Sequence, residues 1–275
     1  MKKIFLSRIS AICFIMLCMP LLLSCSSDDE SPNKEGNVKT HEKRLEMITY
    51  GSPWDMVDLF YYEEESGNIR RITRKSGNAF QDVNFSIFTK NVISWYDEKN
   101  NSYEAKIVDG RAIYMTPKNM YFNYDAAGRL TDVRYSGYNT GCDFTWEGNN
   151  IKEMLKYYRE NGEKISKISF IYGKYKAHAL SRHLMFNPLT MEDLLDCVWE
   201  NALFYTGTCG LLSENLPTSM TIEGYTVDDK GSETLKYSYE MDKDGYPTSV
   251  SIESDKERSE YELPVKISIL WGNNQ

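Results

Sequence analysis

Four segments of the chain repeat one cadence, and this repetition constrains the fold more than any other feature. Each segment begins with aromatic-x-aromatic-acid, passes through a short stretch of Gly, Asn or Asp, and then resumes with apolar residues three positions apart. The four segments are FYYEEESGNIRRI (60–72), FNYDAAGRLTDV (122–133), FTWEGNNIKEM (144–154) and YSYEMDKDGYPTSV (237–250).

This cadence predicts a β-hairpin in each segment. Aromatic side chains at positions i and i+2 share one face of a strand. An acid at the end of the strand can accept hydrogen bonds from the amides of the turn. Gly67, Gly128 and Gly245 can adopt the positive φ that a tight reversal needs. Because the loops differ in length, these are degenerate repeats rather than a strict structural period.

Other segments fit the same interpretation. PVKISILW (264–271) places Val265, Ile267, Ile269 and Trp271 on one face, and KNMYFNY (118–124) places Met120, Phe122 and Tyr124 on one face. NVISWYDEKNNSYEAKIV (91–108) predicts a strand, an Asn-rich turn and a second strand. About a dozen such segments follow one another at the spacing of sandwiches and barrels. The fold class we expect is mainly all-β, as an antiparallel barrel-like or strongly twisted meander sheet.

One segment departs from the strand pattern. In LTMEDLLDCVWENALFYTG (189–207), apolar residues recur at helical spacing. Thr190 and Asp193 resemble a capping box, and Gly207 is placed to end the helix. We therefore predict one α-helix here, which covers a face of the sheet or plugs one end of a barrel.

The hairpin segments resemble two known kinds of sequence. YDAAGRLTDV (124–133) resembles the YD-type hairpin unit of RHS-like repeats. Together with LLSENLPTSMTI (211–222) and DGYPTSV (244–250), residues 43–275 resemble an uncharacterised Bacteroidetes-type lipoprotein family described as having a porin-like β fold. The resemblance implies an architecture and carries over no substrate and no catalytic residue. The turns WEGNN (146–150) and EEESGN (63–68) depart from the pattern of the repeat unit.

The first 25 residues predict export and lipid attachment. A basic start at Lys2, Lys3 and Arg8 precedes an apolar run that is short for a membrane span. The run ends in Leu-Leu-Ser-Cys, which resembles the bacterial lipobox. That resemblance implies removal of residues 1–24 as a lipoprotein signal peptide and acylation of Cys25, which would anchor the protein in a membrane. The alternative is a plain secretory signal that ends by chance near a cysteine.

Acidic and polar residues follow Cys25 at once. SSDDE (26–30) resembles the signal that sends Bacteroidetes-type lipoproteins to the outer face of the outer membrane. The alternative is a solvated spacer on the periplasmic face. We assign residues 25–42 as a flexible acidic tether and residues 43–275 as a single β domain.

Charge and composition exclude some classes of partner. Removing residues 1–24, which carry three basic residues and no acid, takes the formal net charge from −8 to −11. Such an acidic body argues against binding nucleic acid, whose phosphates need Lys and Arg. The 20 Tyr, 11 Phe and 5 Trp residues favour strands.

Three cysteines remain in the body of the chain. Cys197 and Cys209 could form a disulfide bond in an oxidising envelope. Alternatively, these two and Cys142 are buried thiols. We leave both alternatives open.

Aromatic side chains are the better candidates for binding. Sugar rings can stack on flat aromatic faces, and a set of aromatic residues falls off the predicted core face or in loops, where cross-strand packing is the competing explanation. These low-ranked candidates for ligand binding are Trp54, Tyr61, Tyr121, Tyr135 and Tyr138.

Catalytic and metal motifs are weak in this sequence. His178 and His183 lie five residues apart on a predicted strand and so on opposite faces. Glu63, Glu64 and Glu65 are adjacent at a hairpin tip, where carboxylates are usually solvated. DKDG (242–245) is explained better by a hairpin turn than by a calcium loop. We expect no catalytic residue, no metal and no cofactor.

Three functions remain as hypotheses. The first is a binding module at the cell envelope for a glycan or another small ligand. The second is a structural or interaction protein of the outer envelope. The third is a hydrolase, which ranks last.

Overall fold

Residues 41–275 form one compact unit. The structure, a computed structural model, describes residues 43–137, 139–178, 198–210, 213–225, 230–256 and 266–272. The segment 1–42 therefore lies outside the described residues, as do residues 189–197 of the predicted helix.

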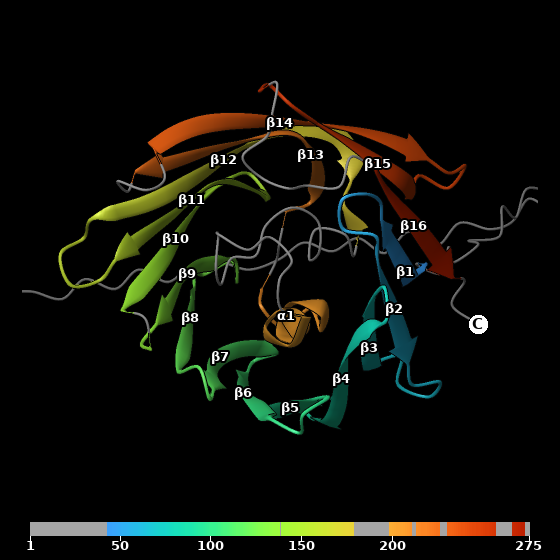
Figure 1. The fold of residues 1–275 in the computed structure, drawn as a ribbon. Helices are drawn as coiled ribbons and strands as arrows, with labels where there is room; N and C mark the ends of the chain where they lie inside the picture. Colours follow the sequence, from blue (N-terminus) through green and yellow to red (C-terminus); the bar gives the residue numbers. More distant parts are fainter. Residues whose placement is uncertain are drawn as a thin grey trace, which may run out of the picture. The chain divides into compact units, whose positions relative to one another are not determined.

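Sixteen strands build the described part of the unit. They are β1 (Arg44–Tyr50), β2 (Met56–Tyr62), β3 (Ile69–Ser76), β4 (Ala79–Phe88), β5 (Val92–Asp97), β6 (Ser102–Val108), β7 (Arg111–Thr116), β8 (Met120–Tyr124), β9 (Leu130–Tyr135), β10 (Thr140–Glu147), β11 (Asn150–Tyr158), β12 (Lys164–Lys176), β13 (Asn215–Tyr225), β14 (Lys230–Met241), β15 (Pro247–Ser254) and β16 (Lys266–Gly272). Each strand pairs antiparallel with its neighbours in sequence, and β16 pairs with β1. The sheet is therefore a closed up-and-down barrel (Figure 1).

The predicted fold class is confirmed, but the number of strands exceeds the expected dozen. Several strands are short, and β8 has only five residues. The reversal between β3 and β4 takes only Gly77 and Asn78, a two-residue turn that the four-segment cadence does not include. A closed sheet has no exposed edge only when every strand is paired on both sides, so each short strand is needed to complete the ring.

All four predicted hairpins are present. The first aromatic residue of a segment faces an apolar residue across the turn: Phe60 pairs with Ile72 and Phe122 with Val133. In the remaining two hairpins, Phe144 pairs with Met154, and Tyr237 pairs with Ile252. Each pair presents two apolar side chains on the same face of neighbouring strands.

Two of the four turn acids, Asp125 and Asp242, accept hydrogen bonds from turn amides as predicted. Asp125 Oδ1 accepts hydrogen bonds from the backbone N–H groups of Ala127 and Arg129, both at 2.9 Å. Asp242 Oδ1 does the same for Asp244 and Tyr246, also at 2.9 Å. The backbone N–H of Arg129 is the main reason why the pKa of Asp125 lies below its usual value, and desolvation opposes this shift.

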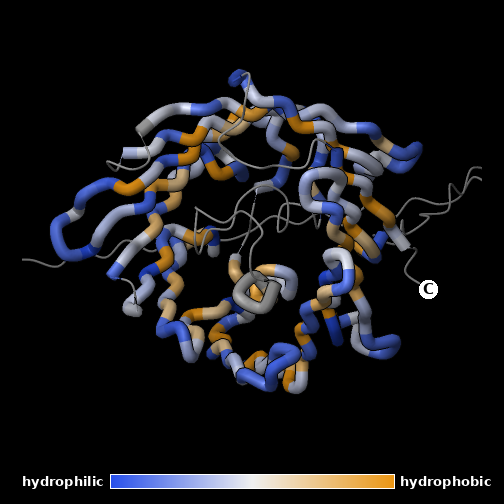
Figure 2. Tube along the Cα trace, in the orientation of Figure 1, coloured by the Kyte–Doolittle hydropathy of each residue, from blue (hydrophilic) through white to orange (hydrophobic). Residues whose placement is uncertain are grey.

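The apolar face of each strand points into the barrel. In β6, Tyr103, Ala105 and Ile107 are buried and alternate with exposed Glu104 and Lys106. Hydrophobic and hydrophilic residues alternate in this way along the strands, and the turns are mostly hydrophilic (Figure 2). The wall thus carries an apolar lining and a polar outer surface.

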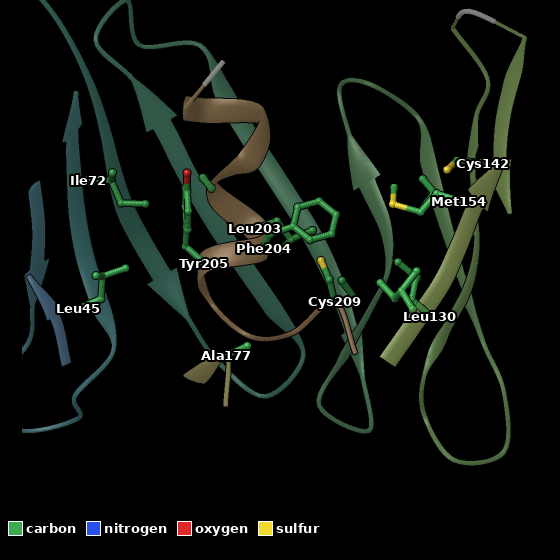
Figure 3. Packing of buried hydrophobic residues seen from close by; sticks show 14 of the residues in the cluster. Leu45, Ile72, Leu130, Cys142, Met154, Ala177, Leu203, Phe204, Tyr205 and Cys209 are labelled. Atoms are coloured by element: carbon green, nitrogen blue, oxygen red, sulfur yellow. The ribbon is translucent and has the colours of Figure 1, made fainter. Parts of the chain in front are cut away.

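Helix α1 (Val198–Tyr205) lies inside the ring of strands (Figure 1). Tyr205 packs edge-on against Phe60 at 5.5 Å between ring centroids, and Phe204 packs against Phe122 at 6.5 Å. Figure 3 shows these two side chains pointing toward different parts of the wall. The prediction of a plugging helix is confirmed for these eight residues, whereas Thr190 and Asp193 lie outside the described residues.

Gly207 ends the helix as the sequence predicts. Its φ is +78°, and its N–H donates to the carbonyl of Phe204 at 3.2 Å. The N–H of Thr206 donates to the carbonyl of Leu203 at the same distance. These bonds satisfy carbonyl groups that the last turn of a helix otherwise leaves unpaired.

A buried ion pair lies beside the helix. Arg74 Nε and Nη2 donate to Asp58 Oδ1 and Oδ2, each at 2.8 Å, and Tyr50 Oη donates to Asp58 Oδ2 at 3.1 Å. Burial lowers the pKa of Arg74, but the charge and hydrogen bonds of Asp58 outweigh it and raise that pKa. Burial is the main cause that raises the pKa of the Tyr205 hydroxyl. The charge of Asp58 raises this pKa further, and the charge of Arg74 lowers it. The pair is fully hydrogen-bonded, which is the condition under which an interior tolerates charge.

The turn acids predict a pH dependence of stability. Because the pKa of Asp125 is lower in the folded chain, its charge stabilises the fold above the unfolded pKa of about 3.9. This contribution is lost as the pH falls through the folded value. We expect Asp125→Asn to lower the urea midpoint at pH 7 and to match the parent near pH 2.

Two variants control for this prediction. Asp125→Ala should lower the midpoint further at pH 7, because Asn keeps an oxygen acceptor and Ala does not. Glu65→Gln, at an exposed hairpin tip, should leave the midpoint unchanged. Equal midpoints for the parent and Asp125→Ala at pH 7 would contradict the role of the turn acid.

Candidate functional site

A cleft with a volume of about 700 Å³ opens at one end of the barrel. Three hairpin turns line it: β6–β7, β8–β9 and β10–β11. The end of β12 and the segment between α1 and β13 complete the lining. Its lining residues are Asp109, Gly110, Arg111, Gly128, Arg129, Trp146, Asn149, Lys176, His178, Gly207, Gly210, Ser213 and Glu214.

Backbone hydrogen bonds fix the chain after α1 against the wall. The N–H of Ala112 on β7 donates to the carbonyl of Thr208 at 2.8 Å. The N–H of Ile151 on β11 donates to Ser213 Oγ at 3.0 Å. The N–H of Ala177 donates to the carbonyl of Glu214 at 2.9 Å. One side of the cleft is therefore built on rigid strands rather than on a free loop.

Arg129 and Trp146 form one wall of the cleft. Arg129 Nε donates to Asp125 Oδ2 and its Nη1 to the carbonyl of Gly148, both at 2.7 Å. The guanidinium lies 5.5 Å from the ring centroid of Trp146, within the range of a cation–π contact. Trp146 Nε1 donates to the carbonyl of Leu130 at 2.8 Å. Both side chains are thus held in fixed positions.

Lys176 and Glu214 form an ion pair beside the turn that carries Asn149. Glu214 Oε2 also accepts a hydrogen bond from Asn149 Nδ2 at 3.1 Å. The hydrogen bond from Lys176, followed by that from Asn149, lowers the pKa of Glu214. A lowered pKa favours the ionised form, whereas a general acid needs a raised one.

His178 closes the cleft toward the turn between β14 and β15. Its ring stacks on Tyr246 at 3.9 Å between centroids, and the edge of Trp271 lies 6.3 Å away. The earlier interpretation of His178 as a strand residue is wrong, because β12 ends at Lys176 and His178 has a φ of +49°. His183 lies outside the described residues.

Four of the five aromatic residues proposed from the sequence lie among the described residues, and these four do not line the cleft. Tyr135 lies on the inner face and is only 9% exposed, so the expectation that it lies off the core face is wrong. Trp54 is half-buried and packs against Tyr50, and Tyr61 lies under Arg71 at 4.3 Å. Tyr121 is exposed and packs on Tyr114 at 4.8 Å between centroids. Tyr138 lies outside the described residues.

Other sequence predictions can be placed as well. DKDG (242–245) forms a hairpin turn, as expected. Cys142 and Cys209 are buried, and the pairing of Cys197 with Cys209 lies outside the described residues. Within the described ranges, no group of three or more His, Cys, Asp or Glu residues is arranged to hold a metal ion.

The sequence reasoning missed the lining of the cleft. The residues come from five separate parts of the chain, which the pairing of successive strands from β6 to β13 brings to one end of the barrel. One signal was available. Arg111 and Arg129 each follow a glycine directly after a hairpin turn, in DGR (109–111) and AGR (127–129). A basic residue repeated at the same place in two hairpins marks one end of a meander barrel.

Gly210 lets the segment after α1 pack closely against Tyr124 and Gly128. Its φ is +83°, and a Cβ atom there would lie 2.8 Å from Tyr124 Cε1 and 2.9 Å from the carbonyl oxygen of Gly128. We expect Gly210→Ala to lose about 1–2 kcal/mol from backbone strain and about 1–3 kcal/mol more from the clash. Urea unfolding would measure both.

Gly245→Ala is the matched control. Gly245 has a φ of +84°, but a Cβ atom there would meet nothing within 4 Å. This variant should therefore lose only the strain contribution. Equal losses for the two variants would show that close packing at Gly210 does not matter.

Solved structures show a similar fold. A porin-like protein from Bacteroides vulgatus ATCC 8482 matches with a TM-score of 0.52 and 12% identity, over 82% of this chain and 97% of that protein. A porin-like protein from Bacteroides uniformis ATCC 8492 gives a TM-score of 0.47 and 13% identity, over 84% and 98%. No family model and no curated protein matches the chain. At this identity, the likeness to the Bacteroides vulgatus protein concerns the fold alone: the chain has a porin-like β-barrel fold.

Proposed function

We propose that this chain is a lipid-anchored protein of the bacterial cell envelope that binds a small polar ligand in the end cleft. The favoured ligand class is a glycan or a glycan-derived molecule. The cleft carries the proposal, because its volume of about 700 Å³ suits a ligand of a few sugar rings. Its wall combines an aromatic side chain with several polar groups in fixed positions.

The outer wall of the barrel supports a location in water beside the membrane. Lys167 on β12 pairs with Glu223 on β13 at 2.9 Å, and Asn123 bonds Asp132 across β8 and β9 at 2.9 Å. A strand that faces lipid costs about 2–4 kcal/mol for a Lys or Arg at the bilayer midplane. Among the described residues, no helix has the length and apolarity to cross a bilayer. An anchor on Cys25 would then hold the domain at the membrane.

The start of the barrel lies near the cleft. Lys43, directly before β1, forms ion pairs with Asp242 at 2.6 Å and with Asp244 at 2.7 Å. The same turn leads to Tyr246, on which His178 of the cleft stacks.

The outer surface gives the second candidate function, a structural or interaction protein. Tyr121 is 46% exposed beside Tyr114 on the outer wall, and Ile171 is 66% exposed on β12. Aromatic residues on a flat sheet surface are typical of contacts with other proteins. The candidate aromatics Trp54, Tyr61 and Tyr138 would belong to this function rather than to the cleft. A hydrolase ranks behind both, because the lowered pKa of Glu214 does not suit a general acid.

Lipid attachment predicts a specific loss on substitution of Cys25. In a Bacteroides host, Cys25→Ser should abolish labelling with a radioactive fatty acid and release the protein from the membrane fraction. Cys18→Ser, within the signal, should leave both unchanged. Protease treatment of intact cells should degrade the parent protein if it lies on the outer face, and leave it intact on the periplasmic face. Labelling of Cys25→Ser equal to the parent would contradict the anchor.

If the ligand binds in the cleft, substitution of Asn149 and substitution of Asn123 should affect the binding affinity differently. Residues 26–275 should bind members of an oligosaccharide library, measured by thermal shift and calorimetry. Asn149→Ala should weaken this binding, because Asn149 lines the cleft. Asn123→Ala should not, because Asn123 makes a similar bond to a carboxylate on the outer wall. A library without any binder up to millimolar concentration would contradict the proposal, and equal effects of both variants would move the site away from the cleft.

A further inference from the structure

The charged groups of the cleft neutralise one another, with two exceptions. Arg129 is paired with Asp125, and Lys176 is paired with Glu214. Arg111 and Asp109 also line the cleft, and neither forms an ion pair with any residue that the structure describes. Asp109 is exposed to water, whereas Arg111 is half-buried. A half-buried guanidinium without a carboxylate can gain more from an added anion than a solvated one.

Contacts on two sides hold the Arg111 side chain in place. Its guanidinium carbon lies 5.8 Å from the ring centroid of Tyr124. That ring is itself fixed, because Tyr124 Oη donates to the carbonyl of Ala112 at 2.6 Å. The guanidinium also lies directly over Gly128, where a Cβ atom would come within 2.0 Å of Arg111 Nη2. A glycine at position 128 therefore makes room for the guanidinium, and little conformational entropy is left to lose on binding.

We propose that Arg111 binds the carboxylate of an acidic saccharide, such as a sugar that carries a uronic acid group. This inference rests on the proposed function and names the ligand class for the same cleft. The planar fork of a guanidinium matches the two oxygens of a carboxylate. Asp109 and Asn149 supply acceptors and a donor for sugar hydroxyl groups. Asp109 also disfavours a phosphate monoester, which carries about −1.5 to −2 charges and is repelled more strongly than a carboxylate.

Calorimetry on residues 26–275 tests this assignment with two probes. One is a trisaccharide that contains uronic acid, and the other is the same trisaccharide with its carboxyl groups reduced to alcohols. The parent should bind the acidic probe more tightly, and added salt should weaken that binding. Arg111→Gln should weaken binding of the acidic probe by about ten-fold or more and leave the neutral probe unchanged.

The matched control is Arg70→Gln, which removes the same charge from an exposed position on β3. It should bind the acidic probe within about two-fold of the parent, because only the long-range field changes. Arg111→Lys keeps the charge without the planar fork and should bind with intermediate affinity. If Arg111→Gln fails to fold, as judged by its thermal melting, Arg111→Lys decides the question on its own.

The outcomes separate this inference from the proposed function. Equal affinity for the two probes, or an unchanged affinity in the Arg111 variants, would overturn the carboxylate assignment and leave ligand binding intact. Tighter binding of a sulfated trisaccharide or of inorganic phosphate than of the acidic probe would also overturn it. If neither trisaccharide binds and the oligosaccharide library is blank as well, both the inference and the proposed function fail.

Discussion

Closure of sixteen strands into one barrel creates an interior that the wall cannot fill by itself. The width of a barrel grows with the number of its strands, and about eight strands already suffice for side chains to fill the middle. Here the wall turns its apolar face inward, so an unfilled interior would leave that face in contact with water. Helix α1 and the chain that follows it reduce this exposure. Phe204 and Tyr205 extend the apolar contact to strands as far apart as β2 and β8.

The cleft follows from the way in which the interior is filled. β12 ends and β13 begins at the end of the barrel where Gly207, directly after α1, lines the cleft. Ala112 on β7, Ile151 on β11 and Ala177, directly after β12, fix the returning chain to the wall. The turns that carry Arg111 and Arg129 line the cleft beside this chain. At the helix, the Asp58–Arg74 pair shows how this interior accommodates charge, because each guanidinium and carboxylate bond is satisfied there. Arg111 differs in lacking such a carboxylate.

Local sequence predicted the hairpins because each is decided within about a dozen residues. The pairings of Phe60 with Ile72 and of Phe122 with Val133 depend only on turn chemistry and on two-residue periodicity. Closure of the barrel could not be predicted in this way, because the pairing of β1 with β16 joins residues more than 200 positions apart. No local sequence pattern indicates such a pairing. The cleft combines residues from five separate parts of the chain, and no local pattern shows which turns face one another across it. Its residues were therefore missed, while Tyr135, placed outside by its neighbours in sequence, proved to face inward.

Whether a barrel is surrounded by lipid or by water depends on the polarity of its outer face and not on its number of strands. A barrel that spans a bilayer turns an apolar band about 25 Å tall toward lipid and can leave polar residues inside. In this chain, Glu104, Lys106 and Lys167 face outward, and the apolar residues of the same strands face inward. The same up-and-down topology thus fits either medium, depending on which face of each strand carries the apolar residues. The likeness to a porin-like protein concerns the path of the backbone and leaves open which residues the outer wall carries, here charged ones such as Glu104, Lys106 and Lys167.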